Sequence, residues 1–264
     1  MARITFLGSG GGRFMTITQK RGTGGFYVED RIKIHVDPGP GAHLRAIQNG
    51  LDPRKTEALL ISHCHTDHFN DVPIMVESMT GGMLKKEGFV VGSKSVIEGR
   101  DEFASIIFPY YRKNLKAVIS LSAGENIDIK GQKIQALKAK HSDPFAIGYK
   151  IFTDSGAISY TSDTEYFNGM EDQYIGSRVM ILNVTRPNGD RIPFHLTTDD
   201  AKNIVKKVNP EVAVITHIGY KMHLKGAEEE RRYIQESTGI KTFIADEGLK
   251  IYMNGQLSYQ ETVK

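Results

Sequence analysis

The 264-residue chain predicts an α/β fold in which two packed β-sheets carry helices on their outer faces. Short apolar runs bounded by turn residues recur along the chain, as is typical of strands. Segments with helical spacing separate these runs at intervals. Because no repeat, low-complexity stretch or linker divides the sequence, residues 1–264 are expected to form a single domain.

The composition excludes several classes of protein. An apolar content of 39% and a charged content of 25% describe an ordinary globular chain. The formal charge of +3 is spread along the sequence, which permits a phosphate-bearing substrate but lacks a nucleic-acid-binding footprint. The single cysteine, Cys64, excludes an internal disulfide and a multi-cysteine metal site. No apolar run is long enough to span a membrane and Met1–Leu7 reads as a strand, so we expect a cytoplasmic protein without a membrane partner.

The first strand, Ile4–Leu7, runs into the glycine loop Gly8–Gly12. A dinucleotide-binding fingerprint would need glycine where Arg13 stands, and no amphipathic helix pattern follows. We therefore interpret the loop as one that lets the backbone pass close to another feature, such as a metal site.

The other elements follow from the same two periodicities. Further strands are predicted at 25–28, 32–36, 58–61, 117–121, 126–129, 133–139, 146–152, 157–160, 179–182, 212–215, 241–244 and 249–253. Helices are predicted at 42–49, 72–79, 198–208 and 227–236. Residues 83–116 give no clear pattern. Within them, the aromatic and basic run Phe108–Lys113 is interpreted as a loop over the core, with a base-stacking surface as the alternative.

The segment His63–His68 contains three histidines and an aspartate directly after a predicted buried strand. Imidazole and carboxylate are the ligands of reactive zinc, iron or manganese sites. Alternate residues of an extended segment point the same way, so His63 and His65 can converge. Asp67 and His68 lie at the following bend, where they can serve a second metal ion.

Three later strands also end near a metal-ligating residue, namely His141, Asp163 and His217. A lone histidine or aspartate at such a position usually caps the strand or is solvated. Together with the first motif, however, these residues supply seven ligands at one kind of position, which a common sheet edge would gather. Asp37 also ends a strand, as a turn former or as a buried carboxylate that orients the histidine segment.

In this order, the motifs resemble the metallo-β-lactamase superfamily, and the resemblance spans nearly the whole chain. It implies a four-layer αββα metallo-β-lactamase sandwich of the α/β (α+β) class. It also implies a metal site for two ions: His63, His65 and His141 on one, Asp67, His68 and His217 on the other, and Asp163 bridging them. Asp37 would match the buried acid of the family.

The nearest branch resembles ribonuclease Z and related phosphodiesterases. Asp163 stands where lactamases usually have cysteine, and His195 in His195–Ala201 is similar to the histidine that assists phosphodiester cleavage. Two departures count against tRNA processing more than against phosphoester hydrolysis. No Gly/Pro- and Lys-rich arm stands out, and Tyr160 occupies the place of the glutamate that partners this histidine.

The resemblance predicts a dinuclear metal-dependent hydrolase, most readily a phosphodiesterase or nuclease. A metal-bridging hydroxide would be the nucleophile, with Asp67 and His195 as catalytic residues. Two divalent ions are expected, zinc first, with manganese or iron as alternatives. The substrate would be a phosphoester-containing small molecule, RNA or DNA, and a homodimer is common in this branch. The alternatives are an ester, lactone or thioester hydrolase and a nucleic-acid-binding protein with an inactive site.

Several polar residues are weaker candidates. Arg186 could clamp a phosphate in the loop before His195, although a lone arginine is more often solvated. His223 could line the mouth of the site. His195 itself could simply precede a helix whose N-cap is Thr197.

Overall fold

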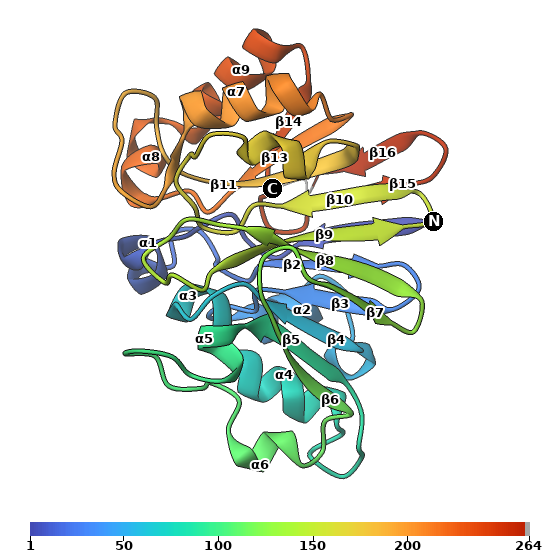
Figure 1. Cartoon of the computed structure of the whole chain (residues 1–264). Coiled ribbons are helices and arrows are strands. Elements are labelled where there is room, and N and C mark those ends of the chain that lie inside the picture. The colour runs from blue at the N-terminus through green and yellow to red at the C-terminus, as the bar shows by residue number, and fades with distance from the viewer. Residues whose placement is uncertain (262–264) are drawn as a thin grey trace.

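The computed structural model describes residues 1–261 and confirms the predicted α/β fold, with two mixed sheets packed face to face (Figure 1). In spatial order, the first sheet contains β16 (Leu257–Gln260), β15 (Lys250–Met253), β1 (Ala2–Phe6), β2 (Phe26–Glu29), β3 (Lys33–Val36), β4 (Ala58–Ile61), β5 (Phe89–Ser93) and β6 (Ala117–Leu121). The second contains β14 (Lys241–Ile244), β13 (Val212–Thr216), β11 (Ser177–Arg186), β10 (Gly156–Tyr160), β9 (Ile147–Thr153), β8 (Gln132–Lys138) and β7 (Asn126–Ile129), and β12 (Leu196–Thr197) pairs with β11.

Helices cover the outer faces of both sheets (Figure 1). The helices formed by residues 1–261 are α1 (Arg13–Thr18), α2 (Ala42–Gln48), α3 (Thr66–Phe69), α4 (Val72–Met79), α5 (Lys94–Ile97), α6 (Pro109–Arg112), α7 (Thr198–Val208), α8 (Tyr220–Lys225) and α9 (Ala227–Thr238), with 3-10 turns at Pro53–Lys55 and Met170–Tyr174. None of the helices formed by residues 1–261 combines the length and apolarity that crossing a lipid bilayer requires.

The interior strand β4 shows why the fold has four layers. Its residues are all buried, and successive side chains point to opposite faces. Leu60 joins the core between the sheets, where it belongs to one cluster with Tyr149 of the second sheet. Leu59 and Ile61 join the outer cluster that includes Met75 of α4. A strand that is buried on both faces has a continuous apolar sequence, and the apolar run at 58–61 predicted this strand for that reason.

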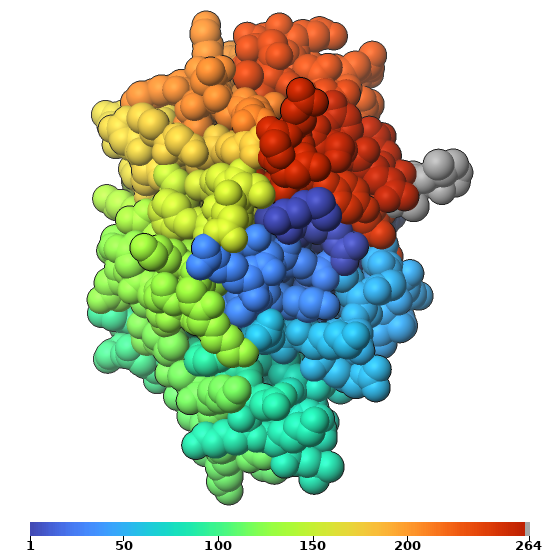
Figure 2. Space-filling view, turned by 90° about the vertical axis from the view of Figure 1, so that its right-hand side faces the viewer, coloured from blue at the N-terminus to red at the C-terminus, as the bar shows by residue number. Residues whose placement is uncertain are grey.

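The N-terminal strand lies beside a C-terminal strand in the first sheet. β15 pairs antiparallel with β1, so that Ala2 lies opposite Met253. Figure 2 shows the same neighbourhood on the surface, where the N-terminal segment in dark blue lies directly against the C-terminal segment in red.

Two regions differ from the sequence-based expectation. α1 directly follows the glycine loop, where the sequence predicted no helix. Only Met15 of its six residues is buried, so the helix has no amphipathic pattern by which it could be recognised. Residues 83–116, for which the sequence predicted no secondary structure, contain β5, α5 and α6. The run Phe108–Lys113 contributes α6, and Phe108 and Tyr110 are exposed on it.

Candidate metal centre

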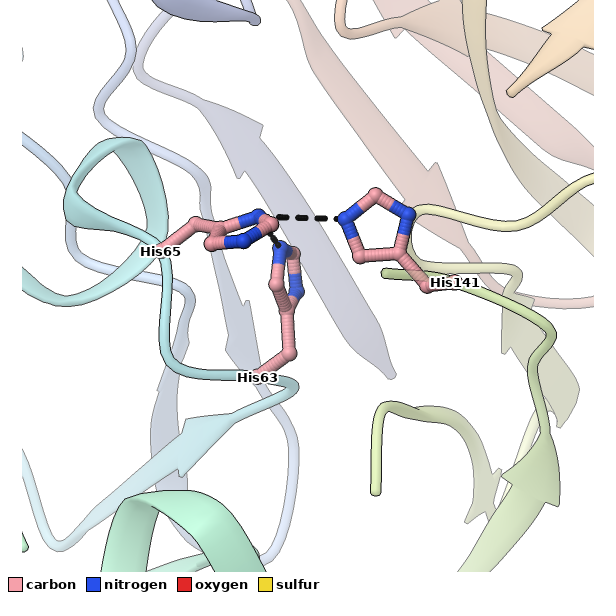
Figure 3. Close-up of side chains that lie close together, drawn as sticks. All are labelled: His63, His65 and His141. Atoms are coloured by element: carbon pink, nitrogen blue, oxygen red, sulfur yellow. Dashed lines mark hydrogen bonds between the residues drawn. The ribbon is translucent and has the colours of Figure 1, made fainter. Parts of the chain in front are cut away.

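The metal-ligand candidates come from both sheets and meet where the strands end. His63 and His65 follow β4 of the first sheet, whereas His141 follows β8 of the second. In Figure 3 the three rings point toward one another across the interface. The Nδ1 atom of His65 lies 3.0 Å from Nε2 of His63 and 3.1 Å from Nε2 of His141. Three imidazole nitrogens are therefore brought to one point.

A second group lies beside the first. Nε2 of His217 is 3.2 Å from Oδ2 of Asp67, and Nε2 of His68 is 3.6 Å from the same oxygen. Asp67 and His68 belong to α3, directly after the first histidines, while His217 follows β13. The residues of this second group therefore also come from both sheets.

The carboxylate of Asp163 lies between the two groups. Its Oδ2 atom is 3.1 Å from Nε2 of His217, 3.8 Å from Nε2 of His141 and 4.0 Å from Nε2 of His63. Its Oδ1 atom is 3.7 Å from Nε2 of His68. The structure thus brings all seven predicted side chains into one cluster, with Asp163 in reach of each group.

The arrangement fits divalent metal ions. Zinc binds nitrogen and oxygen at about 2.0–2.2 Å, so two ligands of one ion can lie at most about 4.4 Å apart. The distances given above satisfy this limit. In addition, Nε2 of His68 is buried and has no hydrogen-bond partner in the described part of the chain, although it faces the carboxylates of Asp67 and Asp163. A bound cation would satisfy this orphaned atom.

The other nitrogens of these rings are held by hydrogen bonds. Nδ1 of His141 lies 3.0 Å from the carbonyl oxygen of Phe194, and Nδ1 of His68 lies 2.8 Å from the carboxylate of Asp37. An imidazole N–H that donates to such an acceptor leaves the lone pair on Nε2, which faces the cluster. These contacts therefore turn Nε2 of both rings toward the cluster.

The electrostatics of the cluster favour a cation. Burial, followed by repulsion from neighbouring imidazoles, lowers the pKa of His63 and His65. Burial acts to raise the pKa of Asp67 and Asp163, but nearby imidazoles outweigh it and hold both pKa values well below the usual range. Burial also opposes protonation of His68, yet the surrounding carboxylates raise its pKa to about 10. The same negative charge would attract a divalent ion.

The structure confirms that Asp37 is a buried carboxylate behind the histidine segment. It accepts hydrogen bonds from the backbone N–H of Ser62 at 2.7 Å and from its hydroxyl at 2.7 Å. It also accepts from Nδ1 of His68 at 2.8 Å and from the Tyr160 hydroxyl at 2.7 Å. One carboxylate thus holds the start and the end of the segment that carries the first ligands.

The glycine loop passes directly against the cluster, as interpreted from the sequence. The N–H of Gly12 donates to Oδ2 of Asp67 at 2.8 Å. A Cβ on Gly11 would lie 2.1 Å from the ring of His217, so a larger residue would displace that ring. The glycines therefore allow the backbone to approach the cluster closely.

Non-glycine residues in the left-handed backbone region gather around the site. Asp37, Ser162, His217 and Phe194 have φ values of 49°, 58°, 55° and 67°. Each such conformation costs about 1–3 kcal/mol and persists only where the surroundings enforce it. At this site, the polar contacts of the cluster hold the backbone in this conformation.

His195 lies at the edge of the cluster and retains some exposure. Its Nδ1 atom is 3.7 Å from Oδ2 of Asp163 and 3.2 Å from the hydroxyl of Thr185, and its side chain is 18% exposed. Burial is the largest influence and lowers the pKa of His195 to about 4, so the ring is neutral at pH 7. The predicted N-cap Thr197 is confirmed, with a capping box to Asp200.

The weaker candidates have partners elsewhere. Arg186 donates to the backbone carbonyl of Asp190 and forms an ion pair with its carboxylate at 2.6 Å. Nδ1 of His223 accepts from Arg21 at 3.2 Å. Neither side chain is among the contacts of the cluster.

Sequence reasoning missed several residues that support the site. Nδ2 of Asn183 donates to Asp163 at 2.6 Å. The buried carboxylate of Asp143 accepts from the backbone N–H of Cys64 at 3.0 Å and from the hydroxyl of Ser95. The position of Asp143, two residues after His141, is the one signal that could have drawn attention to it.

Comparison with known proteins identifies the family. Residues 33–218 match the model of the β-lactamase superfamily domain. This chain belongs to the metallo-β-lactamase superfamily. It is 42% identical to an uncharacterised protein of Methanocaldococcus jannaschii over 261 residues, which is 97% of each chain. The predicted resemblance to the superfamily and to its ribonuclease Z-like branch is confirmed.

Two further comparisons agree with this assignment. This metallo-β-lactamase protein is 28% identical to ribonuclease Z of Methanosarcina mazei over 155 residues, covering 57% of this chain and 48% of that protein. The match therefore spans about half the length of that ribonuclease Z. The structure of YhfI from Bacillus subtilis superposes with a TM-score of 0.78 at 18% identity, covering 94% of this chain and 98% of that chain, which confirms the fold.

Proposed function

We propose that this metallo-β-lactamase protein is a dinuclear metal-dependent hydrolase that cleaves phosphodiester bonds. The observation that carries this proposal is the position of Asp163, whose carboxylate lies within 4.0 Å of ligand atoms in both groups. Two neighbouring ligand sets that share one carboxylate are typical of two-metal hydrolytic sites. The similarity to ribonuclease Z of Methanosarcina mazei supports a phosphodiester substrate, in a small molecule, RNA or DNA.

Under this proposal the seven side chains of the cluster hold the ions, which would be zinc first, or manganese or iron. The ions would supply an activated water and neutralise charge on the phosphate oxygens. Asp67, kept ionised by the neighbouring imidazoles and by the N–H of Gly12, would hold its ion firmly. The single-domain organisation over 1–264, a homodimer and a cytoplasmic location stay predictions.

His195 is the residue that favours phosphodiesters over acyl substrates. Its ring is neutral in the resting protein, lies beside Asp163 and is partly exposed. With a phosphate anion bound beside it, the ring would take up a proton from bulk water and could then donate that proton to the leaving oxygen. An ester or lactone site has less need of such a donor next to an anionic centre.

The function is tested on the purified 264-residue chain by elemental analysis and a substrate panel. We expect two divalent ions per chain and hydrolysis of bis(p-nitrophenyl) phosphate and of a dinucleotide, with little activity on thioesters and lactones. A protein that binds two ions but hydrolyses only lactones or thioesters would overturn the phosphodiester assignment. A protein that binds none would overturn the metal centre.

Replacement of His195 by glutamine is expected to lower kcat on a dinucleotide by about 10²–10⁴-fold, the range typical of a lost general acid. The effect on bis(p-nitrophenyl) phosphate should be much smaller, because nitrophenolate leaves without a proton. Metal content should stay at two ions, and His223→Gln serves as the control. Equal losses of kcat on both substrates would contradict the role of His195 as an acid. Loss of a bound ion would instead show that His195 is a metal ligand, since its ring nitrogens lie close enough to His141 and Asp163 to share an ion with them.

A further inference from the structure

We propose that Thr185 is a positioning residue that fixes the tautomer of His195 by linking it to His217. The inference rests on the proposed function, in which His217 is a metal ligand and His195 faces the substrate. It concerns a hydroxyl that no sequence motif singled out.

The backbone places this hydroxyl between the two rings. In the parallel pairing of β11 with β12, Val184 lies opposite Leu196 and Arg186 opposite Thr197, so Thr185 is the extra residue of an irregular register. His195 directly precedes the paired segment of β12. The Thr185 side chain is thereby turned toward the cluster, where the residue is only 5% exposed.

Two short contacts define the link. Oγ1 of Thr185 lies 2.9 Å from Nδ1 of His217 and 3.2 Å from Nδ1 of His195. The two rings are also stacked, with centroids 5.8 Å apart and planes inclined by 20°. Stacking sets the plane of the His195 ring, and the hydroxyl sets which of its nitrogens is engaged.

The directions of the two hydrogen bonds follow from the position of His217. Its Nε2 atom faces the carboxylates of Asp67 and Asp163 at 3.2 Å and 3.1 Å, so under the proposed function it offers a lone pair to a metal ion there. The hydrogen of His217 is then on Nδ1 and is donated to Thr185. The Thr185 hydroxyl can donate its single hydrogen to Nδ1 of His195. If Nδ1 of His195 carried a hydrogen instead, the Thr185 oxygen could accept it, but the buried hydroxyl hydrogen would then have no acceptor among residues 1–261. We therefore place the hydrogen of His195 on Nε2, where it is available to a substrate oxygen.

Thr185 has no competitor for this role in the described structure. Among residues 1–261 its hydroxyl is the one hydrogen-bond partner of the His195 ring, since Asp163 lies at 3.7 Å. Tyr160, which stands where the resemblance to ribonuclease Z would place a glutamate partner, donates to Asp37 at 2.7 Å and accepts from Asn183 at 3.1 Å. The orienting contact thus comes from β11 and not from the end of β10.

The test compares Thr185→Val, which keeps the shape but removes the hydroxyl, with Thr185→Ser, which keeps the hydroxyl. Imidazole ¹⁵N chemical shifts of the zinc-loaded protein report the His195 tautomer independently of activity. We expect Nε2–H in the wild type and in Thr185→Ser, and a mixture of tautomers in Thr185→Val. The valine variant should lose about 10–100-fold in kcat on a dinucleotide at saturating zinc, the usual cost of losing an orienting contact, with KM unchanged. His217 loses its acceptor in the same variant, so the affinity for zinc should also fall and kcat is compared with two ions bound.

Coupling to His195 provides the control. In a His195→Gln background, Thr185→Val should cause little additional loss of kcat, because both changes remove one function. A wild-type tautomer ratio in Thr185→Val, or an equal loss in Thr185→Ser, would overturn the inference. If the wild type lacks phosphodiesterase activity, the proposed function fails, while the ¹⁵N measurement still decides whether Thr185 sets the tautomer.

Discussion

Replacing Asp163 by alanine is expected to lower phosphodiester hydrolysis by about 10³-fold or more and to leave fewer than two ions bound per chain. The carboxylate is the group that both ligand sets share, since it lies 3.1 Å from Nε2 of His217 and 3.8 Å from Nε2 of His141. Loss of a single group that stabilises charge in a transition state costs about 10²–10³-fold, and this change should also remove metal. Elemental analysis and kcat/KM on a dinucleotide measure the two effects.

A matched control is Asp154→Ala, which removes an exposed carboxylate that pairs with Arg31 on the surface. That change should leave metal content and activity as they are, because exposed ion pairs contribute little. An Asp163→Ala protein that kept two ions and full activity would show that the site works without a shared carboxylate.

Replacing Asp37 by alanine is expected to lower the free energy of unfolding by about 3–5 kcal/mol. The change leaves the backbone N–H and hydroxyl of Ser62, the Nδ1 of His68 and the hydroxyl of Tyr160 without their acceptor in a buried place. Each buried donor without a partner carries a desolvation penalty of about 1–3 kcal/mol, partly relieved by relaxation. Urea unfolding in the presence of a chelator separates this effect from metal binding.

The comparison variant is Tyr160→Phe, which removes one of the four donors and leaves the carboxylate in place. Its cost should be about 1–2 kcal/mol, because the other three donors to Asp37 are kept and one N–H of Asn183 also loses its acceptor. If Asp37→Ala and Tyr160→Phe were equally stable, Asp37 would not be the centre of the hydrogen-bond network described here.

The sequence predicted the site residues that lie close together in the chain, and those that directly follow a strand. The run from His63 to His68 could be read directly, because an extended segment and a bend fix the directions of four side chains. His141 and His217 could be assigned only by their place after strands, and their convergence depends on the packing of two sheets. The positions of these residues after strands did not by themselves show that they converge. The resemblance to the superfamily predicted the convergence.

Thr185, Asn183 and Asp143 could not be predicted, because they are small polar residues whose roles exist only through tertiary contacts. Each looks like an ordinary turn or strand residue in the sequence, and no spacing relates it to its partner. β5 was missed for a different reason. Its run from Phe89 ends in Gly92 and Ser93, and it lies in a segment rich in glycine and lysine that gives no alternation.

The contacts behind His63 and His65 have a consequence for how the protein holds together. Asp143 binds the N–H of Cys64, the N–H of Ile147 donates to the carbonyl of Ser62 at 3.1 Å, and the Tyr149 hydroxyl donates to the carbonyl of Ile61 at 2.9 Å. These bonds form a seam between the two sheets, and the proposed ions would lie at one end of it. A metal held by residues from both sides would act as a cross-link, so its binding free energy would add to the work of separating the sheets. Loss of metal would then weaken the protein first along this seam.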